Sequence, residues 1–124
     1  MDKKYKVMIV EDDDSITQVY NFKLKAEGID SIVAKDGEEA VAKVISEKPD
    51  LILLDLMLPK KDGFWVLEQV RKNPASMVTP IIVISNIWEQ SDKEKALVLG
   101  ANEFLVKVDV SIPQIIEKIK ENLK

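Results

Sequence analysis

Five residues carry the side chains from which a reactive site could be built, and each follows an apolar run. They are Glu11, Asp12, Asp55, Ser85 and Lys107. Carboxylates bind hard cations and can act as nucleophiles, a hydroxyl donates hydrogen bonds, and an ammonium neutralises an anionic oxygen. Each residue alone also has an ordinary explanation as a helix cap, a turn residue or a surface group. Their shared position at the ends of apolar runs favours a common site.

The stretch 51–63, Leu-Ile-Leu-Leu-Asp-Leu-Met-Leu-Pro-Lys-Lys-Asp-Gly, contains the most informative of these positions. Its first four residues are apolar without alternation, which is typical of a strand buried on both faces. A proline and an Asp-Gly pair then predict a turn, so Asp55 lies near the carboxyl end of the strand, where open α/β sheets bind ligands. From this stretch alone, Asp55 is equally well explained as a polar residue that ends the strand.

The apolar run 6–10 is followed directly by four acidic residues at positions 11–14. Asp13 or Asp14 can cap a helix that begins at Ser15 and ends at Gly28. Capping explains one or two of these acids but not all four. The remainder are available for binding a cation.

The elements that must position these residues alternate along the chain. Apolar runs predict strands at 6–10, 29–34, 51–55, 80–85 and 103–107. Amphipathic stretches predict helices after Asp13 or Asp14, after Asp36, after Gly63, over 88–99 and over 112–123. In the helix after Asp36, the residues predicted to face inward are Ala40, Val41, Val44 and Ile45. Alternation of this kind predicts an α/β fold with a largely parallel sheet. The carboxyl ends of the strands then share one rim.

Size and charge limit the classes of protein. A chain of 124 residues with 46% hydrophobic residues is long enough for one core and predicts one domain. Its net charge is −4 and Arg71 is its only arginine, so we expect no nucleic-acid partner.

Absent residue types narrow the chemistry further. The chain has no cysteine and no histidine, which excludes disulfides, thiolate chemistry and histidine-based proton transfer. No apolar run approaches the roughly 18 residues of a membrane span, and the first residues lack the apolar core of a secretory signal. We therefore expect a cytoplasmic protein with no membrane partner.

Four motifs in order resemble those of the receiver domain of two-component response regulators: Val-Glu-Asp-Asp, Leu-Leu-Asp-Leu-Met-Leu-Pro-Lys-Lys-Asp-Gly, Ile-Val-Ile-Ser-Asn and Phe-Leu-Val-Lys. The likeness covers the whole chain. It implies a single receiver domain over 1–124, of the stand-alone, chemotaxis-regulator-like form without an output domain. It also implies a doubly wound, flavodoxin-like α/β fold with a five-stranded parallel sheet in the order 2-1-3-4-5 and five flanking helices.

The resemblance also implies roles for individual residues. Asp55 would be the phosphoacceptor, and Ser85 and Lys107 would contact its phosphoryl group. The metal would be Mg²⁺, which prefers oxygen ligands. Its ligands would be Asp12, Asp55 and the backbone carbonyl of Met57, with Glu11 acting through water. Ser85 and Phe104 would be the switch residues.

The function implied is a phosphorylation-activated signalling switch, not an enzyme. Its phosphodonor would be a histidine kinase or a phosphotransfer protein, because the chain has no histidine of its own. The signal would pass to a downstream protein, or to a second copy of the chain, through the surface of the fourth helix, last strand and last helix. Met57 and Ile87 would border the approach of water to the phosphoryl group, and neither can position a water well. We therefore expect slow self-dephosphorylation.

One departure from the family pattern follows Lys107, where receivers often have proline and this chain has Val108. A cis peptide without proline costs about 3 to 4 kcal/mol. We therefore predict a trans or locally strained peptide between the two residues.

Three other classes of protein fit the sequence less well. A haloacid-dehalogenase-type phosphatase also uses an aspartyl nucleophile, but it needs a second aspartate where this chain has Met57. A receiver-like module that only binds would lack one of the acids, the nucleophile or the lysine, and all are present. A dinucleotide-binding domain would have a glycine-rich turn after the first strand, where this chain has acids.

Overall fold

The computed structural model describes residues 4–86 and 89–123. Its elements alternate along the whole chain. In order they are β1 (Lys6–Val10), α1 (Asp14–Ala26), β2 (Asp30–Ala34), α2 (Gly37–Glu47), β3 (Leu51–Asp55), α3 (Gly63–Lys72), β4 (Ile81–Ser85), α4 (Gln90–Val98), β5 (Glu103–Val106), the 3₁₀ turn η1 (Lys107–Asp109) and α5 (Ile112–Asn122).

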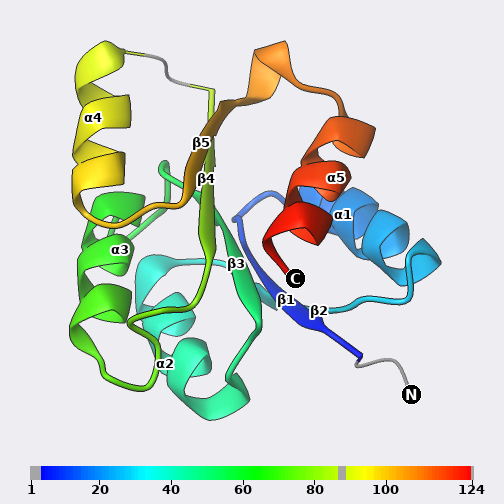
Figure 1. Cartoon of the computed structure of the whole chain (residues 1–124), viewed down its shortest axis with the longest axis horizontal. Helices are drawn as coiled ribbons and strands as arrows, with labels where there is room; N and C mark the ends of the chain where they lie inside the picture. The colour runs from blue at the N-terminus through cyan, green and yellow to red at the C-terminus, as the bar shows by residue number, and fades with distance from the viewer. Residues whose placement is uncertain (1–3, 87–88, 124) are drawn as a thin grey trace.

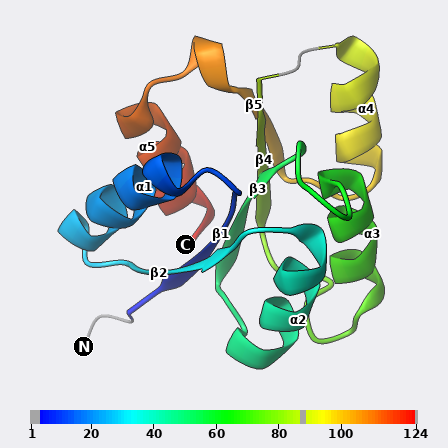
Figure 2. The same ribbon diagram turned by 180° about the vertical axis from the view of Figure 1, so that it is seen from behind.

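The strands form one five-stranded parallel sheet in the order β2-β1-β3-β4-β5, which confirms the predicted α/β fold and strand order. Helices α1 and α5 cover one face, and α2, α3 and α4 cover the other (Figures 1 and 2). Parallel neighbours require these crossover helices, so both faces of the central strands are buried.

Two hydrophobic cores lie on either side of the sheet because successive side chains of a strand point to opposite faces. In β3, Leu51 and Leu53 join the core under α1 and α5, whereas Ile52 and Leu54 join the core under α2, α3 and α4. Every residue of β3 is buried, including Asp55 at its end. The uninterrupted apolar run in the sequence therefore corresponds to a strand with no solvent-exposed face.

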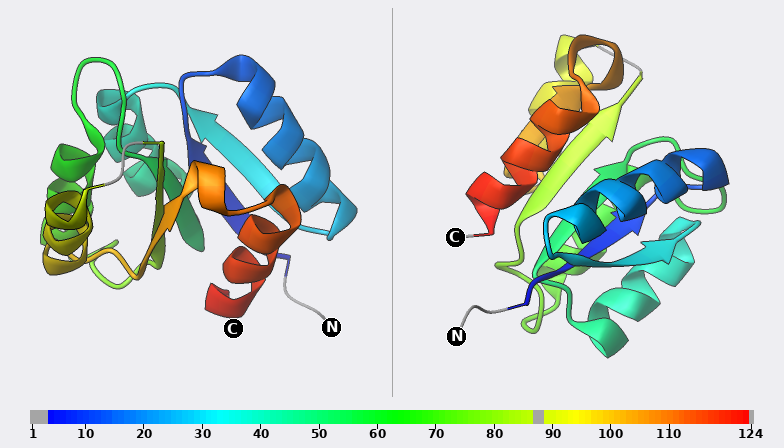
Figure 3. Two further views of the ribbon diagram at one scale, coloured as in Figure 1. Left: turned by 90° about the horizontal axis from the view of Figure 1, so that it is seen from above. Right: turned by 90° about the vertical axis from the view of Figure 1, so that its right-hand side faces the viewer.

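The strand register brings the predicted site residues to one rim. Val10 of β1 lies opposite Leu54 of β3, so Glu11 and Asp55 leave neighbouring strands at the same level. Ser85 ends β4 opposite Val106 of β5, directly before Lys107. Figure 3, left, shows the molecule from above, with the loops around this rim.

Helix α2 departs from the prediction at one position. Ala40 and Val44 are buried and Val41 is half-buried, as expected, but the Ile45 side chain is 51% exposed. The buried stripe of this helix runs through Gly37, Ala40 and Val44. Ile45 lies about 100° further around the helix than Val44, on the solvent side.

Some predicted boundaries also shift. Asp13 caps α1 through hydrogen bonds from the backbone N–H groups of Ser15 and Ile16, so the helix begins at Asp14. The predicted strand 103–107 ends at Val106, and Lys107 opens the turn η1. The predicted helix 88–99 begins at Gln90, while residues 87–88 lie outside the described part of the chain.

The described peptide bonds are all trans, which confirms the trans prediction for Lys107 and Val108. Within the part of the chain that the structure describes, no helix is both long and apolar enough to cross a membrane.

Candidate functional site

A largely buried ammonium joins the ends of three strands at the rim. Lys107 Nζ lies 2.8 Å from Glu11 Oε1 and 2.8 Å from Asp55 Oδ2, and it donates a hydrogen bond to each. The side chains are 15%, 5% and 8% exposed for Lys107, Glu11 and Asp55 respectively. Charges this far from water are stable in a protein only when paired and hydrogen-bonded. The three residues therefore form one electrostatic unit, as their shared rim predicted.

Backbone amides hold the other oxygens of both carboxylates. Met57 N donates to Asp55 Oδ1 over 2.9 Å, and Asp13 N donates to Glu11 Oε2 over 3.3 Å. Such short-range bonds from an acid to an amide two residues on are typical of turns. They orient each carboxylate toward Lys107.

The pKa of Lys107 is set by opposing effects. Burial lowers it, but hydrogen bonds and charge attraction from Asp55 and Glu11 outweigh burial and hold the pKa of the ammonium above its ordinary value. Lys107 is therefore fully protonated at neutral pH. A fixed positive charge beside Asp55 suits the binding of an anionic group.

Ser85 is fully buried at the end of β4, one position beyond the residue that pairs with Asp55. A cavity of about 140 Å³ opens beside it, lined by Leu56, Met57, Asp62, Phe64, Ser85 and Asp92. The cavity lies between the loop after β3 and the start of α4. Its lining includes the residues directly after Asp55, so Ser85 faces space beside the candidate nucleophile.

The carboxylate oxygens at the rim are ligands of the kind that a hard divalent cation prefers. Asp12 is exposed next to buried Glu11, and the rim also carries Asp55 and the backbone carbonyl of Met57. These are all oxygen donors, and Mg²⁺ typically takes one or two carboxylates and keeps several waters. Across residues 4–86 and 89–123, no three acidic side chains already converge in a metal-binding arrangement. Glu11 and Asp55 meet at the Lys107 ammonium instead.

The remaining predicted residues occupy different settings. Phe104 is half-buried on β5 and packs against the core under α2, α3 and α4. The Met57 side chain is 55% exposed at the edge of the cavity. Ile87 lies outside the described residues, so its predicted role stays a prediction.

The two acidic residues that line the cavity were not predicted as part of the site. Asp62 has the pattern of a turn residue, and it does cap α3 by accepting a hydrogen bond from Trp65 N. Asp92 belongs to a mixed-charge stretch that is typical of a solvated helix face. The six residues between Asp62 and the end of β3 provided a signal for the first, since such a short loop must fold back over the strand end.

The fold and the rim are those of a phosphoacceptor signalling module, and residues 7–120 match the model of the response regulator receiver domain. The chain belongs to this family. Receiver domains bind a divalent metal at the active site and serve as signalling phosphoacceptors between a histidine kinase and an effector.

Individual relatives agree with this assignment. The alkaline phosphatase synthesis transcriptional regulatory protein PhoP of Bacillus subtilis is 42% identical over 102 residues, which are 82% of this chain and 42% of that protein. The chain thus spans about two-fifths of that relative. A CheY-like receiver domain structure from Methanospirillum hungatei is 28% identical with a TM-score of 0.90, covering 98% of this chain and 94% of that one. The Mn²⁺-bound response regulator Rcp1 is 31% identical with a TM-score of 0.77, covering 83% and 81%.

Replacing Lys107 with methionine tests the electrostatic unit. The change leaves two buried carboxylates without a cation, so without metal it should lower the free energy of unfolding by about 3 kcal/mol at pH 7. Because the pKa of Lys107 is raised on folding, its contribution is complete below the pKa of a free lysine, about 10.4, and is lost as pH rises through the folded-state value. The difference between the two proteins should be constant from pH 7 to 9 and shrink above pH 10.

Urea unfolding in a chelating buffer at each pH measures this difference. Lys118→Met is the matched control, since its ion pair with Glu103 is 3.3 Å long and the lysine is 43% exposed. An exposed pair contributes at most about 1 kcal/mol. An equal loss in both variants would contradict the assignment of a buried, paired ammonium.

Proposed function

We propose that Asp55 accepts a phosphoryl group from a phosphohistidine of a partner histidine kinase or phosphotransfer protein in a Mg²⁺-dependent reaction. The observation that carries the proposal is the double hydrogen bond from Lys107 to Glu11 and Asp55. These hydrogen bonds place the Lys107 ammonium, the Asp55 nucleophile and the Glu11 carboxylate next to one another. The acyl phosphate then changes the surface formed by α4, β5 and α5.

The reaction forms one bond and breaks one. An Asp55 carboxylate oxygen attacks phosphorus, and the phosphorus–nitrogen bond of the donor breaks with its electron pair returning to the imidazole. Both the nucleophile and the phosphoryl oxygens are negative, so positioning and charge neutralisation dominate catalysis. Lys107 then exchanges its hydrogen bond to Asp55 for one to a phosphoryl oxygen, whose negative charge it neutralises.

A metal at the rim would supply the second positive charge. Asp12, Asp55 and the Met57 carbonyl would hold it, with Glu11 acting through water. The Mn²⁺-bound form of the relative Rcp1 supports a divalent cation in this family. The oxygen donor set of this rim supports a hard divalent cation such as Mg²⁺, because soft ligands are absent from the whole chain except for methionine thioethers.

The proposed conformational switch combines the buried Ser85 hydroxyl with a loosely packed helix α4. The Ser85 hydroxyl lies beside the cavity and would donate a hydrogen bond to a phosphoryl oxygen, drawing the end of β4 toward Asp55. Phe104 would turn inward behind it. Helix α4 supports a movable surface, because Ala96 is the one buried residue of this helix and its N-cap, Glu89, makes no side-chain capping bond.

The phosphoacceptor is tested by Asp55→Asn. An amide is not a nucleophile for acyl-phosphate formation, so the variant should take up no acid-labile phosphate from acetyl phosphate in Mg²⁺. Asp30→Asn is the control, since this exposed aspartate begins β2 at the opposite rim. Radiolabelled phosphate incorporation measures both, and uptake by Asp55→Asn at the wild-type rate would refute the assignment.

Metal binding is tested by stability and by one ligand variant. A cation that binds only the folded protein adds about 1.4 kcal/mol to the free energy of unfolding at tenfold its dissociation constant, so Mg²⁺ should raise the melting temperature. Asp12→Ala should weaken Mg²⁺ binding about tenfold or more, whereas Asp109→Ala in η1 should not. Titration calorimetry measures both affinities. Unchanged affinity in Asp12→Ala would place the metal elsewhere.

The lifetime of the acyl phosphate is tested at Met57. Its thioether positions a water poorly, so we infer that self-dephosphorylation is slow and that Met57→Asn accelerates phosphate release about tenfold or more. Met77→Asn is the control, since Met77 is similarly exposed, at 52%, in the loop after α3. The decay of the labelled protein after removal of donor measures the rate, and equal decay in wild type and Met57→Asn would rule out this role.

A further inference from the structure

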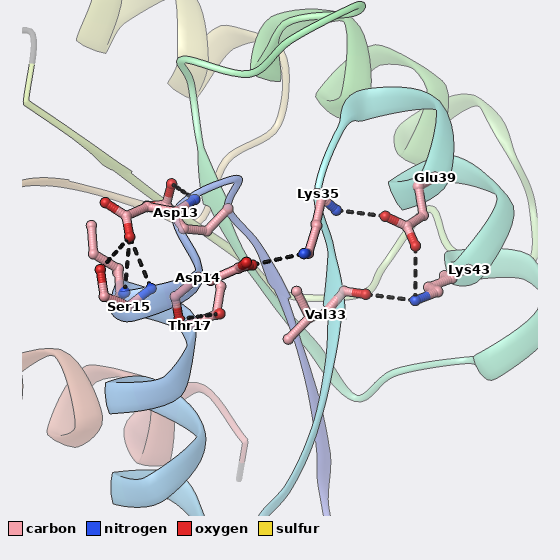
Figure 4. Close-up of polar contacts among 10 residues, drawn as sticks. Asp13, Asp14, Ser15, Thr17, Val33, Lys35, Glu39 and Lys43 are labelled. Carbon is pink, nitrogen blue, oxygen red and sulfur yellow. Dashed lines mark hydrogen bonds and ion pairs between the residues drawn. The ribbon is translucent and has the colours of Figure 1, made fainter.

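The turn between β2 and α2, residues 35–37 with Gly37 as the first residue of the helix, contacts the first residue of α1 and the loop between β3 and α3. Lys35 Nζ lies 2.7 Å from Asp14 Oδ1 at the start of α1 (Figure 4), just after the acidic loop. Asp36 Oδ2 lies 3.4 Å from Lys60 Nζ in the loop between β3 and α3. Neither contact was evident from sequence pattern, because the partners are far apart in the chain. This segment, the β2–α2 turn, thus connects two sides of the rim.

The β2–α2 turn is itself held firmly by its own helix. Glu39 N donates to Asp36 Oδ1 over 2.8 Å, and Lys35 N donates to Glu39 Oε1 over 2.6 Å. The other Glu39 oxygen pairs with Lys43 at 3.0 Å (Figure 4). The hydrogen bond from Glu39 N also holds the pKa of Asp36 below its ordinary value. Reciprocal bonds of this kind satisfy the free amides of a helix start and fix the entering chain.

Gly37 lets the turn approach the β3–α3 loop closely. A Cβ at this position would overlap the Lys61 carbonyl oxygen and lie 2.8 Å from Lys61 Cβ. The obstacle is backbone, so it cannot be relieved by rotating a side chain. Glycine is required here for space and not for an unusual φ angle.

The base of the same loop is closed by a second glycine. Gly63 N donates to the Leu56 carbonyl over 3.0 Å, and a Cβ on Gly63 would lie 2.7 Å from Leu56 Cα. Between these points Lys60 takes a left-handed conformation with φ 66°. The loop 56–62 is therefore closed at its base by Gly63 and supported near its tip by the β2–α2 turn.

We propose that Asp36 and Gly37 are positioning residues for the metal site, because they hold the loop that presents the Met57 carbonyl. The inference rests on the proposed function. Mg²⁺ requires nearly ideal octahedral geometry at about 2.0 to 2.1 Å, so a small displacement of one carbonyl weakens binding. The β2–α2 turn contributes no ligand and acts only through the position of the loop.

Gly37→Ala is the decisive variant. The added methyl must push Lys61 away, so we expect backbone hydrogen exchange of residues 57–62 to quicken about tenfold in the metal-free protein. Mg²⁺ affinity should fall about tenfold, as outer-shell changes commonly do. Hydrogen exchange with mass spectrometry and titration calorimetry measure the two effects independently of phosphorylation.

Gly28→Ala is the matched control. Gly28 has φ 75° with nothing within 4 Å of its would-be Cβ, so alanine there is strained but displaces no neighbour. It follows α1 at the opposite rim. This variant should lower the melting temperature and leave Mg²⁺ affinity and exchange of 57–62 unchanged.

Asp36→Asn provides a second test that retains the fold. Asparagine caps a helix as well as aspartate does, so α2 should remain intact while the pair with Lys60 is lost. We expect Mg²⁺ affinity to fall about two- to threefold, since an exposed pair is weak. Lys60→Gln should cause the same fall, and the double variant should add nothing further.

The outcomes distinguish a failure of the proposed function from a failure of this inference alone. Wild-type protein that shows no saturable Mg²⁺ binding would overturn the proposed function and this inference together. Wild-type binding with unchanged affinity and exchange in Gly37→Ala would overturn the inference alone, as would equal loss of affinity in Gly28→Ala. If Gly37→Ala does not fold, the Asp36 and Lys60 variants decide, and full wild-type affinity in both would overturn it.

Discussion

The pairing of one largely buried ammonium with two buried carboxylates is the constraint on which the rest of this structure depends. Lys107, Glu11 and Asp55 leave three different strands, and each charge would be costly without the others. Because β1, β3 and β5 run in the same direction, their carboxyl ends meet at one rim. The apolar strands, the crossover helices and the short loops therefore serve to place three charged atoms within hydrogen-bond distance.

The loops around this rim differ in how firmly they are held. The β3–α3 loop is supported by Gly37 and closed by Gly63, which suits a segment that must present ligands in fixed geometry. Helix α4 is held more loosely, because Ala96 is its one buried residue. Loose packing suits the proposed role of this helix in switching. The firmly held loop and the loosely packed helix thus border the same cavity beside Ser85.

Much of this arrangement could be predicted from the sequence because it depends on local patterns. Uninterrupted apolar runs identified the strands, and polar residues at the ends of four of them identified the rim. The exposure of Ile45 was not predicted, since two adjacent apolar residues on a helix give no sign of which one faces the core. Lys107 leaves the strand for a 3₁₀ turn, a boundary that periodicity does not resolve. The contacts of Asp36 with Lys60 and of Gly37 with Lys61 join distant segments, and nothing in a single sequence specifies them.

The central claim is that Asp55, one of the two carboxylates paired with Lys107, becomes phosphorylated. Borohydride reduces an aspartyl phosphate to homoserine and leaves ordinary aspartate unchanged, so trapping followed by peptide mass spectrometry locates the modified residue. Wild-type protein exposed to acetyl phosphate and Mg²⁺ should contain homoserine at position 55 and at no other aspartate, and omission of Mg²⁺ should abolish it. Homoserine at Asp12 or Asp13 in place of Asp55, or none at all in protein that binds Mg²⁺, would contradict the account.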